Sequence, residues 1–579
     1  MNRIKTIASL LQILVGLVSA ALCFRLAGWS NDLADLPAHF SWALFLVLGS
    51  TSLEALRAVL SGDPLRYLKQ RKLRLTLLAL SIGASIVPGL ASGSLSDRTL
   101  IAISCSSLLT LAIVSLATFT RISSSRWFSR QHPGVLGIAS FGMAILFGAI
   151  LLRGPNASAT HQSIDWQDAF FTSTSAVCVT GLTTLDTEHD LSLFGKIVIL
   201  VLIQLGGLGI MTWAYLMAVA FGERISLRDQ VILQDLLTHD AISDLKQRLV
   251  TIFVITFVVE LAASIVLYLQ WSGIGETASE DAFHAIFHAV SGYCNAGFSS
   301  FSLNLADPRL ESKSAATAIV ALLVILGGLG TPVWIELIAK AKTALYNAAR
   351  SRESKSERLF FSLHTRLALT TTFALLLLGA LGLQLTRYAE FDGEGQSWFL
   401  SFFDSVTART AGFNIAPLSE YSHSSLSLLM ILMFIGGCPG GTAGGIKCTT
   451  FSIVLINLRQ VMQSRSSTVV WKRNIPPMVT SQALAIITIG GSWIILSSVI
   501  IEWIHPEIPF FDTLFETVSA LGTVGLSRGI TPELSAAAKW IIIVTMFVGR
   551  LGILFVICSL LPPRPETRVT YPDESPLLS

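Results

Sequence analysis

The sequence predicts an all-α polytopic membrane protein in which four pseudo-symmetric repeats surround one pore, preceded by about four extra N-terminal spans. Three observations lead to this fold class. Hydrophobic residues make up 52% of the 579 residues and charged residues only 13%, whereas soluble proteins carry about 25% charged residues. About a dozen stretches are long and apolar enough to cross a bilayer, which takes about 20 residues each. A short motif also recurs four times along the chain.

The composition excludes several classes of protein. So few charged residues do not suit the surface of a soluble enzyme or of a disordered chain. Continuous apolar stretches also differ from the alternating strands of an outer-membrane β-barrel. The seven cysteines are scattered, and their spacing fits neither a disulfide framework nor a zinc site. These exclusions leave a helical membrane protein.

The apolar stretches predict twelve membrane-spanning helices. The first follows Arg3 and Lys5 as a signal peptide would, but it is long for the apolar core of a signal peptide and lacks a cleavage site of small residues. We therefore count it as a span. The twelve stretches are 7–27, 40–61, 75–95, 99–120, 134–153, 192–220, 248–273, 316–340, 366–386, 425–460, 480–503 and 538–561.

The lysines and arginines predict the orientation of the spans. Most of these 40 residues lie after even-numbered spans or at the two ends of the chain. Five of them fall between Arg66 and Arg74, and seven between Lys340 and Arg366. Because basic loops stay in the cytoplasm, we expect a multi-pass protein of the inner (plasma) membrane with both termini cytoplasmic.

Four apolar segments are too short to span, and each runs into a glycine. A phenylalanine precedes each glycine by ten residues, and the glycines recur roughly every 115 residues. The segments are FTSTSAVCVTGL (171–182), FHAVSGYCNAGF (287–298), FFDSVTARTAGF (402–413) and FETVSALGTVGL (515–526), with Phe171, Phe287, Phe402 and Phe515 as the phenylalanines. The next span contains QLGGLG, ILGGLG, FIGGCPG or FVGRLG in turn.

Each repeat therefore has the order span, short re-entrant helix, glycine-bearing loop and span. Irregular backbone at membrane depth is tolerated where it is buried in protein or lines a water-filled cavity. Glycine allows the positive φ that turns carbonyls inward. The alternative is that the glycines only let helices pack closely, but packing does not require a fourfold register. The expected parts are an N-terminal transmembrane extension (1–133), four pore repeats (134–235, 236–350, 351–470 and 471–561) and a cytoplasmic tail (562–579).

The pore region resembles the TrkH/KtrB/HKT superfamily of potassium transporters, and especially the KtrB-type membrane subunit. The motifs that carry the resemblance are ARTAGFN at 408–414 and GGCPGGTAGGIK at 436–447, supported by GYCNAGF at 292–298. The resemblance covers about three quarters of the chain and leaves out residues 1–133. It implies a homodimer in the lipid membrane that binds a cytosolic nucleotide-binding regulatory subunit of the KtrA/TrkA type, with no nucleic acid and no cofactor in this chain.

The resemblance also implies a K⁺ selectivity filter made of backbone carbonyls, which replace the hydration shell of the ion. Serine at the first of the four glycine positions goes with sodium preference in some plant members of the family. Glycine at all four positions here favours potassium. The expected filter residues are Val179, Thr180, Gly181, Asn295, Ala296, Gly297, Thr410, Ala411, Gly412, Thr523, Val524 and Gly525.

A glycine-rich segment interrupts the stretch 425–460. Six glycines and a proline in ten residues cannot hold a stable helix, and the resemblance implies that this loop is a gate below the filter. A phosphate-binding P-loop is the competing interpretation, but the sequence lacks the required glycine–lysine pair after a strand. The gate residues are Gly436, Gly437, Cys438, Pro439, Gly440, Gly441, Thr442, Ala443, Gly444 and Gly445.

Arg550 replaces the second glycine of the GGLG motif inside the last span, where a charge costs about 2.5–3.5 kcal/mol on insertion scales. The resemblance implies that Arg550 acts in the gate as an electrostatic barrier to cations. The same argument applies to Lys447, but more weakly. The alternative is a structural ion pair, with Glu260 or Glu336 as its partner.

Three further groups have two interpretations each. His284 and His288 are spaced by one helical turn, with Glu280 a turn earlier, and this spacing can suit zinc. A fourth ligand is not evident, so no metal is expected beyond K⁺ at the filter. Asp404 and Glu516 lie on the third and fourth short helices. They either enrich cations at the pore mouth or cap backbone donors, and the sequence does not separate these.

The predicted function is potassium uptake through a carbonyl-lined filter, gated by the glycine-rich loop and an arginine. One alternative is a sodium-selective or sodium-coupled transporter of the same superfamily. The other is a membrane-embedded enzyme or a nucleotide-driven pump. No catalytic triad, Cys–His pair or dinucleotide-binding glycine motif occurs in a suitable context, so we expect no enzyme activity.

Overall fold

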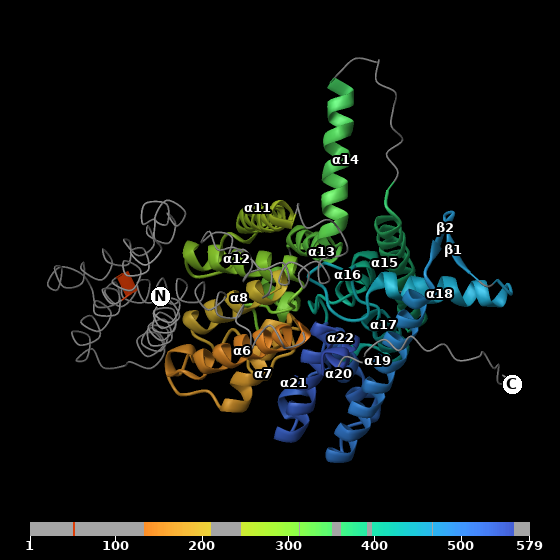
Figure 1. The fold of residues 1–579 in the computed structure, drawn as a ribbon. Coiled ribbons are helices and arrows are strands. Elements are labelled where there is room, and N and C mark those ends of the chain that lie inside the picture. The colour runs from red at the N-terminus through yellow and green to blue at the C-terminus, as the bar shows by residue number, and fades with distance from the viewer. Residues whose placement is uncertain are drawn as a thin grey trace, which may run out of the picture.

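The computed structural model describes residues 50–51, 133–209, 245–311, 313–349, 361–390, 397–465 and 467–560, and these residues are mostly helical (Figure 1). The predicted N-terminal spans therefore lie outside the described residues, apart from Ser50 and Thr51. The second half of the stretch 192–220 and the tail 562–579 lie outside them as well.

One succession of three helices occurs four times. A long helix is followed by a short helix and then by a second helix, and the short helix packs against both neighbours. The four sets are α6 (Pro133–Arg153), α7 (Trp166–Cys178) and α8 (Leu193–Leu208); α11 (Leu245–Trp271), α12 (Ala278–Cys294) and α13 (Ser314–Gly328); α15 (Leu363–Glu390), α16 (Trp398–Thr407) and α17 (His423–Phe434); and α19 (Pro477–Ile504), α20 (Phe510–Gly522) and α21 (Ala536–Leu551).

The four sets close into a ring. The second helix of one set packs against the short helix of another: α8 against α12, α13 against α16, α17 against α20, and α21 against α7. The last of these contacts joins the end of the described chain to its beginning. The short helices are therefore held from both sides around a common centre.

Side-chain caps fix where three of the short helices begin. Asp165 accepts a hydrogen bond from the backbone of Gln167, Thr277 from that of Glu280, and Ser397 from that of Phe399. Such caps satisfy N–H groups that have no partner within the helix. The fourth short helix begins after a proline, Pro509.

Three of the described helices are long and apolar enough to cross a membrane: Val250–Trp271, Leu363–Arg387 and Pro477–Ile504. Their sides away from the core carry exposed apolar side chains, such as Leu261 at 64% and Trp503 at 82% exposure. Large exposed apolar surfaces mark contact with a membrane or another protein. This agrees with the predicted helical membrane protein.

Two further second helices are bent at a break, which the sequence predicted only for the stretch 425–460. The stretch 316–340 bends by 97° between α13 and α14 (Thr331–Ala349), and the stretch 538–561 bends by 92° between α21 and α22 (Ile553–Leu560). Glycines at positive φ lie at these breaks: Gly330 (φ 83°) and Gly552 (φ 88°). Gly209 (φ 82°) ends α8 in the same way. The final glycine of each GGLG or GRLG motif is therefore a helix terminator.

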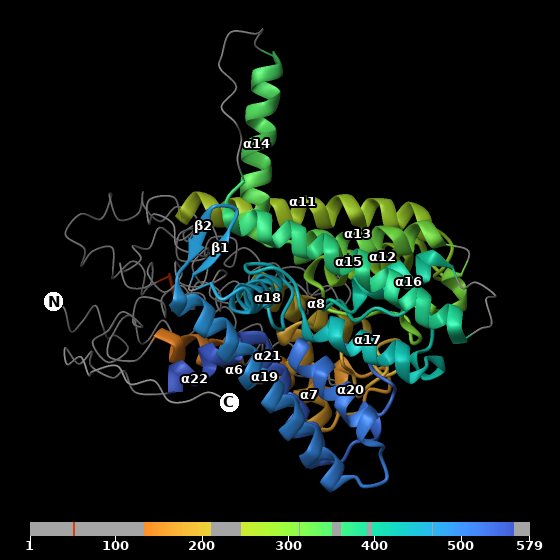
Figure 2. The ribbon, with the colours of Figure 1, turned by 90° about the vertical axis from the view of Figure 1, so that its right-hand side faces the viewer.

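Helix α14, helix α18 (Cys448–Met462) and a small hairpin do not belong to the four sets of helices. Helix α14 extends away from the other described helices in both views (Figures 1 and 2). Helix α18 leads into a small antiparallel hairpin, β1 (Thr468–Val470) and β2 (Arg473–Ile475), with Thr468 opposite Ile475. Trp471 and Lys472 form its turn at positive φ. This hairpin is a small exception to the predicted all-α fold.

A buried ion pair joins α15 to α16. Arg387 and Asp404 are both almost completely buried, and they bind each other directly. Arg387 also donates to Ser401 at 3.0 Å, and Asp404 accepts from Tyr421 at 2.7 Å. Asp404 is thus bound by donors of the protein itself. This favours a structural role for Asp404 over the enrichment of cations at the pore mouth.

We expect Asp404→Asn to destabilise the protein strongly. The change leaves Arg387 buried without its counter-charge, which costs about 3–5 kcal/mol in comparable pairs. The measurement is the thermal unfolding midpoint of the purified protein in detergent. Glu507→Gln is the control, because Glu507 forms an exposed pair with His505 and exposed pairs contribute little. Equal midpoints for the two variants would contradict the role of the buried pair.

Candidate functional site

The four predicted filter loops meet at the centre of the ring. In each loop, the glycine lies against the carbonyl oxygen of the residue that precedes the next loop's glycine. A Cβ atom built on Gly181 would lie 2.5 Å from the oxygen of Ala296, far inside contact distance. The full cycle of contacts is Gly181 with Ala296, Gly297 with Ala411, Gly412 with Val524, and Gly525 with Thr180.

The backbone of these loops is left-handed at two positions each. The four glycines have φ between 72° and 96°. The residue two positions before each glycine is also left-handed: Val179 (φ 57°), Asn295 (φ 59°), Thr410 (φ 80°) and Thr523 (φ 50°). Valine and threonine are β-branched, so a positive φ is strained there. Such strain persists only where the surrounding structure imposes it, and it gathers at functional sites. The twelve predicted filter residues are therefore brought together in a shared, strained conformation.

Four buried hydroxyl groups brace the loops, and the sequence analysis did not single them out. Ser175 accepts from the backbone N–H of Gly181 at 3.0 Å, and Ser519 from that of Gly525 at 3.1 Å. Ser291 and Thr407 donate to the carbonyls of Phe298 at 2.7 Å and Phe413 at 2.6 Å. A signal is present in the sequence, because a Ser or Thr follows a phenylalanine by four residues in FTSTS, FHAVS, FDSVT and FETVS.

The third repeat differs from the predicted alignment by one residue. Phe403 is the completely buried equivalent of Phe171, Phe287 and Phe515, whereas the predicted Phe402 is 38% exposed. The bracing Thr407 lies four residues after Phe403, as Ser175 does after Phe171. The connection from the bracing hydroxyl to the glycine is therefore one residue shorter in this repeat. Two adjacent phenylalanines made the prediction ambiguous, and burial selects the second.

Three threonine hydroxyls in the ring are buried and have no hydrogen-bond partner among the described residues. They belong to Thr180, Thr410 and Thr523, each of which has no exposed surface. Buried polar atoms are normally satisfied, and an exception requires an explanation. Thr410 and Thr523 lie two residues before their glycines, whereas Thr180 directly precedes Gly181, and an unpartnered oxygen is suited to bind a cation or water.

The glycine-rich segment forms a loop between α17 and α18. Its two ends are joined by the backbone bond from Gly436 to Ile446, at 2.8 Å. The second repeat holds it from one side: Cys438 N–H donates to the carbonyl of Gly328 at 2.9 Å, and Thr331 N–H to that of Gly440 at 3.0 Å. The helix break after α13 thus provides the groups that anchor the loop.

The loop lies directly against the ring. A Cβ atom on Gly436 would lie 3.3 Å from a methyl group of Thr410, and one on Gly444 would collide with the hydroxyl of Thr523. The loop therefore packs under the left-handed residues of the third and fourth filter loops. Lys447 folds back onto its own loop and donates to the carbonyl of Ala443 at 2.6 Å.

Arg550 joins the glycine-rich loop to the first repeat. Its guanidinium donates to the carbonyl of Thr442 in the loop and to that of Gly206 near the end of α8. Carbonyls at the end of a helix lack partners within the helix and carry partial negative charge. Neither predicted carboxylate binds Arg550. Glu260 accepts from Gln204 at 3.1 Å, and Glu336 pairs with Lys340 at 3.0 Å, so the predicted ion-pair alternative is wrong.

A second buried arginine lies beneath the same loop and was not predicted. Arg409 donates to the carbonyls of Thr372 at 3.4 Å and Gly436 at 3.3 Å. The thiols of Cys438 and Cys448 lie 3.4 Å apart at the base of the loop. The available sequence signal was the arginine of ARTAGFN, whose charge is unusual beside a filter loop. Two arginines thus hold the loop by its carbonyls.

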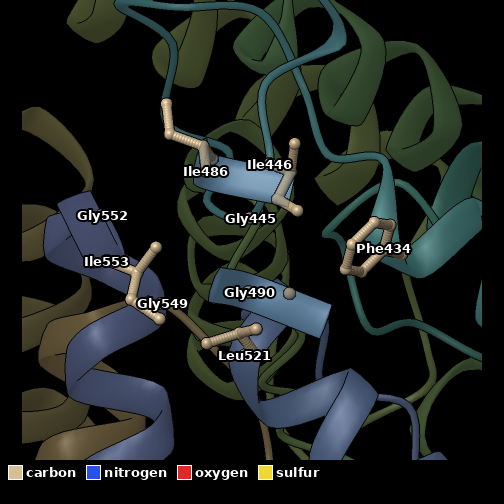
Figure 3. A pocket seen from close by; sticks show the side chains of 10 residues that line it. Phe434, Gly445, Ile446, Ile486, Gly490, Leu521, Gly549, Gly552 and Ile553 are labelled. Atoms are coloured by element: carbon tan, nitrogen blue, oxygen red, sulfur yellow. The ribbon is translucent and has the colours of Figure 1, made fainter. Parts of the chain in front are cut away.

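An apolar pocket flanks the loop where α21 bends into α22. Figure 3 shows the side chains of Phe434 (α17), Ile446, Ile486 (α19), Leu521 (α20) and Ile553 (α22) around it. Its walls carry almost no polar groups, which does not suit an ion. The lining residues are Phe434, Gly445, Ile446, Ile486, Gly490, Leu521, Gly522, Gly549, Gly552 and Ile553.

The histidines of α12 have structural partners. His284 binds the hydroxyl of Ser300 at 2.6 Å, and both ring nitrogens of His288 are engaged, with the carbonyl of His284 and with Ser299. Glu516 likewise binds the loop after the fourth glycine, through Thr531 at 3.0 Å. Within the described part of the chain, no group of three metal-ligating side chains comes together. These residues brace the segments that follow the filter loops.

Comparisons with known proteins give the family. The TrkH family, described as cation transport proteins, matches residues 105–563. The Ktr system potassium uptake protein B of Bacillus subtilis is 34% identical over 466 residues, covering 77% of this chain and 97% of that protein. The potassium/sodium uptake protein NtpJ of Enterococcus hirae is 34% identical over 473 residues, covering 79% and 99%.

The fold is also shared with a solved structure. The crystal structure of the potassium transporter TrkH from Vibrio parahaemolyticus superimposes with a TM-score of 0.61 at 17% identity, covering 85% of this chain and 98% of that one. Together with the sequence matches, this likeness assigns the chain to the TrkH/KtrB superfamily of cation transport proteins, as a KtrB-type member.

Proposed function

We propose that this chain takes up potassium ions across the plasma membrane, through the ring of glycine loops at its centre. The observation that carries the proposal is the cyclic contact between each filter glycine and a carbonyl of the next loop. In this proposal the four repeats, 134–235, 236–350, 351–470 and 471–561, surround one pore. The relatives named as potassium uptake proteins support potassium as the ion.

The proposed filter works by replacing water around the ion. In this proposal the carbonyl oxygens of the four loops face one centre, where such a ring replaces the hydration shell of K⁺. The proposal also assigns to this environment the unpartnered hydroxyls of Thr410 and Thr523, which hold equivalent positions two residues before their glycines. The strained left-handed backbone is the means by which successive carbonyls are directed there. The filter residues proposed are the twelve named from the sequence.

The proposed gate is the loop from Gly436 to Gly445, together with Arg550 and Lys447. The loop lies under the ring, and Arg550 ties its Thr442 carbonyl to the end of α8. Opening then requires these hydrogen bonds to break and the loop to move aside. The positive charge of Arg550 would also repel a cation that passes it.

The membrane potential suffices to drive uptake in this proposal. One elementary charge gains about 2.3 kcal/mol for each 100 mV, which corresponds to roughly fiftyfold accumulation at equilibrium. Uptake therefore needs no ATP hydrolysis by this chain. The chain belongs to a family of transporters, which removes the membrane-embedded enzyme as an alternative. A sodium-selective or sodium-coupled transporter remains the second candidate, because NtpJ is named a potassium/sodium uptake protein.

The proposed assembly follows from the family. Several relatives are named as parts of a Ktr or Trk system, which supports a separate cytosolic nucleotide-binding regulatory subunit of the KtrA/TrkA type. We further propose a homodimer in the lipid bilayer, with both termini in the cytoplasm. The orientation rests on the basic loops described from the sequence.

The chain should restore growth at low potassium to cells that lack their own potassium uptake systems. Growth that depends on K⁺, and that persists without added Na⁺, supports uptake of potassium alone. Growth that requires Na⁺ would favour the sodium-coupled candidate. If the protein reaches the membrane with a regulatory subunit and growth is not restored, the proposed function is wrong.

Gly412→Ser should lower the preference for K⁺ over Na⁺ in uptake. A Cβ atom at this position collides with the carbonyl of Val524, so the loops must move apart. Gly491→Ser is the matched control, because a Cβ atom there has nothing within 4 Å. The measurement is the ratio of initial K⁺ and Na⁺ uptake rates at equal membrane abundance. An unchanged ratio in Gly412→Ser would place position 412 outside the filter.

Arg550→Ala should raise K⁺ flux per molecule by about tenfold, because both the repulsion and the tie to Thr442 are lost. Arg550→Lys separates these two effects. Lysine keeps the charge but lacks the planar fork that reaches two carbonyls at once. If the lysine variant has a flux near that of the parent, the positive charge at position 550 limits the flux. If its flux is as high as that of the alanine variant, the hydrogen bond to the Thr442 carbonyl limits it. Reduced abundance with unchanged flux per molecule would show a structural role only.

A further inference from the structure

Asn304 connects two of the four filter loops. Its side-chain amide nitrogen lies 3.3 Å from the carbonyl oxygen of Gly297 and 3.4 Å from that of Gly412. These carbonyls belong to the glycines of the second and third repeats. One side chain therefore uses both N–H groups of its amide on neighbouring loops of the ring.

The backbone around Asn304 holds the amide in place. Asn304 has a φ of 58°, a conformation that asparagine tolerates better than other non-glycine residues. Its own oxygen accepts the backbone N–H of Leu305 at 2.9 Å, which fixes the orientation of the amide. The amide nitrogen is thereby directed at the ring.

The segment that carries Asn304 is fastened on both sides. His288 binds Ser299 at 2.9 Å, before Asn304 in the chain, and Arg309 pairs with Glu188 at 2.7 Å, after it. Ser302 donates to Asp186 of the first repeat. Asn304 is thus supported by the second short helix and by the loop after the first glycine.

The other repeats lack this contact within the described residues. The positions seven residues after the remaining glycines are Glu188, Ser419 and Pro532. Glu188 has no donor at neutral pH and binds Arg309, while proline has no polar side chain. The ring is therefore asymmetric at this level, with amide donors on the side of the second and third loops.

We propose that Asn304 is a selectivity-determining positioning residue of the filter, which tunes the Gly297 and Gly412 carbonyls for K⁺ over Na⁺. This inference rests on the proposed function of the ring. A carbonyl that shares its lone pairs with an N–H group presents a weaker field to an ion. Field strength and cavity size are the two properties held to set K⁺ over Na⁺ selectivity. The amide weakens the field and fixes the separation of the two loops, and both effects disfavour the smaller Na⁺.

Asn304→Gly is the main test, because glycine adopts the same positive φ without strain and removes only the side chain. The K⁺ to Na⁺ ratio of initial uptake rates should fall about fivefold, which corresponds to about 1 kcal/mol. The full chain is expressed in cells without other potassium uptake, and membrane abundance is measured in the same cells. The apparent KM for K⁺ should change more than the maximal rate, because ion binding is altered.

Asn304→Asp is the second variant, since it keeps nearly the same shape but replaces the two donors by negative charge. It should lower the ratio further and lower the KM for both ions. Leu303→Ala is the matched control, because Leu303 is adjacent to Asn304 and its apolar side chain is 58% exposed. Its ratio should equal that of the parent.

The outcomes separate this inference from the proposed function. If the parent chain takes up no K⁺, the proposed function fails, and this inference fails with it. If the parent is K⁺-selective and both Asn304 variants keep its ratio at normal abundance, only the inference is overturned. If Asn304→Gly does not reach the membrane, the ratio of Asn304→Asp decides. A fall of the same size in Leu303→Ala would also overturn it, since a general disturbance of this segment would then explain the effect.

Discussion

The rest of the structure depends on one steric constraint, which is the close approach of four glycines to the carbonyl oxygens of neighbouring loops. No side chain fits between Gly181 and Ala296, nor at the three equivalent contacts. Three of the short helices, α7, α12 and α20, end directly at the left-handed residue that precedes each glycine by two positions. Buried phenylalanines and hydroxyls then hold each helix end in the position that the contact between glycine and carbonyl requires. The outer helices provide the packing that supports these ends.

Much of this site could be predicted, because the steric constraint restricts which residues can occupy certain positions in the sequence. Only glycine suits the contact, so Gly181, Gly297, Gly412 and Gly525 recur with a period, and the glycine-rich loop is visible for the same reason. The alignment of the third repeat with the other three could not be predicted as reliably. Phe402 and Phe403 are adjacent, and the choice between them depends on which helix face is buried.

The partners of Arg550 could not be predicted for a different reason. A sequence search for partners of a buried arginine looks for carboxylates, such as Glu260 or Glu336. The actual acceptors are the backbone carbonyls of Thr442 and Gly206. Every residue has a backbone carbonyl, so the sequence does not mark these two as acceptors. Gly206 lies in the last turn of α8, where its carbonyl accepts the N–H of Gly209 as well as that of Arg550, and Thr442 lies in a loop. The bends after α13 and α21 have the same origin, since they depend on glycines whose conformation is set by tertiary contacts. A nearly fourfold ring thus carries features from single repeats: the loop of the third, Arg550 of the fourth and Asn304 of the second.

The central claim is that a monovalent cation binds at the centre of this ring. Thallium(I), which replaces K⁺ in size and charge, allows the claim to be tested by anomalous X-ray scattering from crystals of the full chain. The account predicts anomalous peaks on the axis between the loops of Gly181, Gly297, Gly412 and Gly525, which disappear when the crystals are soaked in excess K⁺. Thallium bound elsewhere in the protein, with no peak on that axis, would contradict the account.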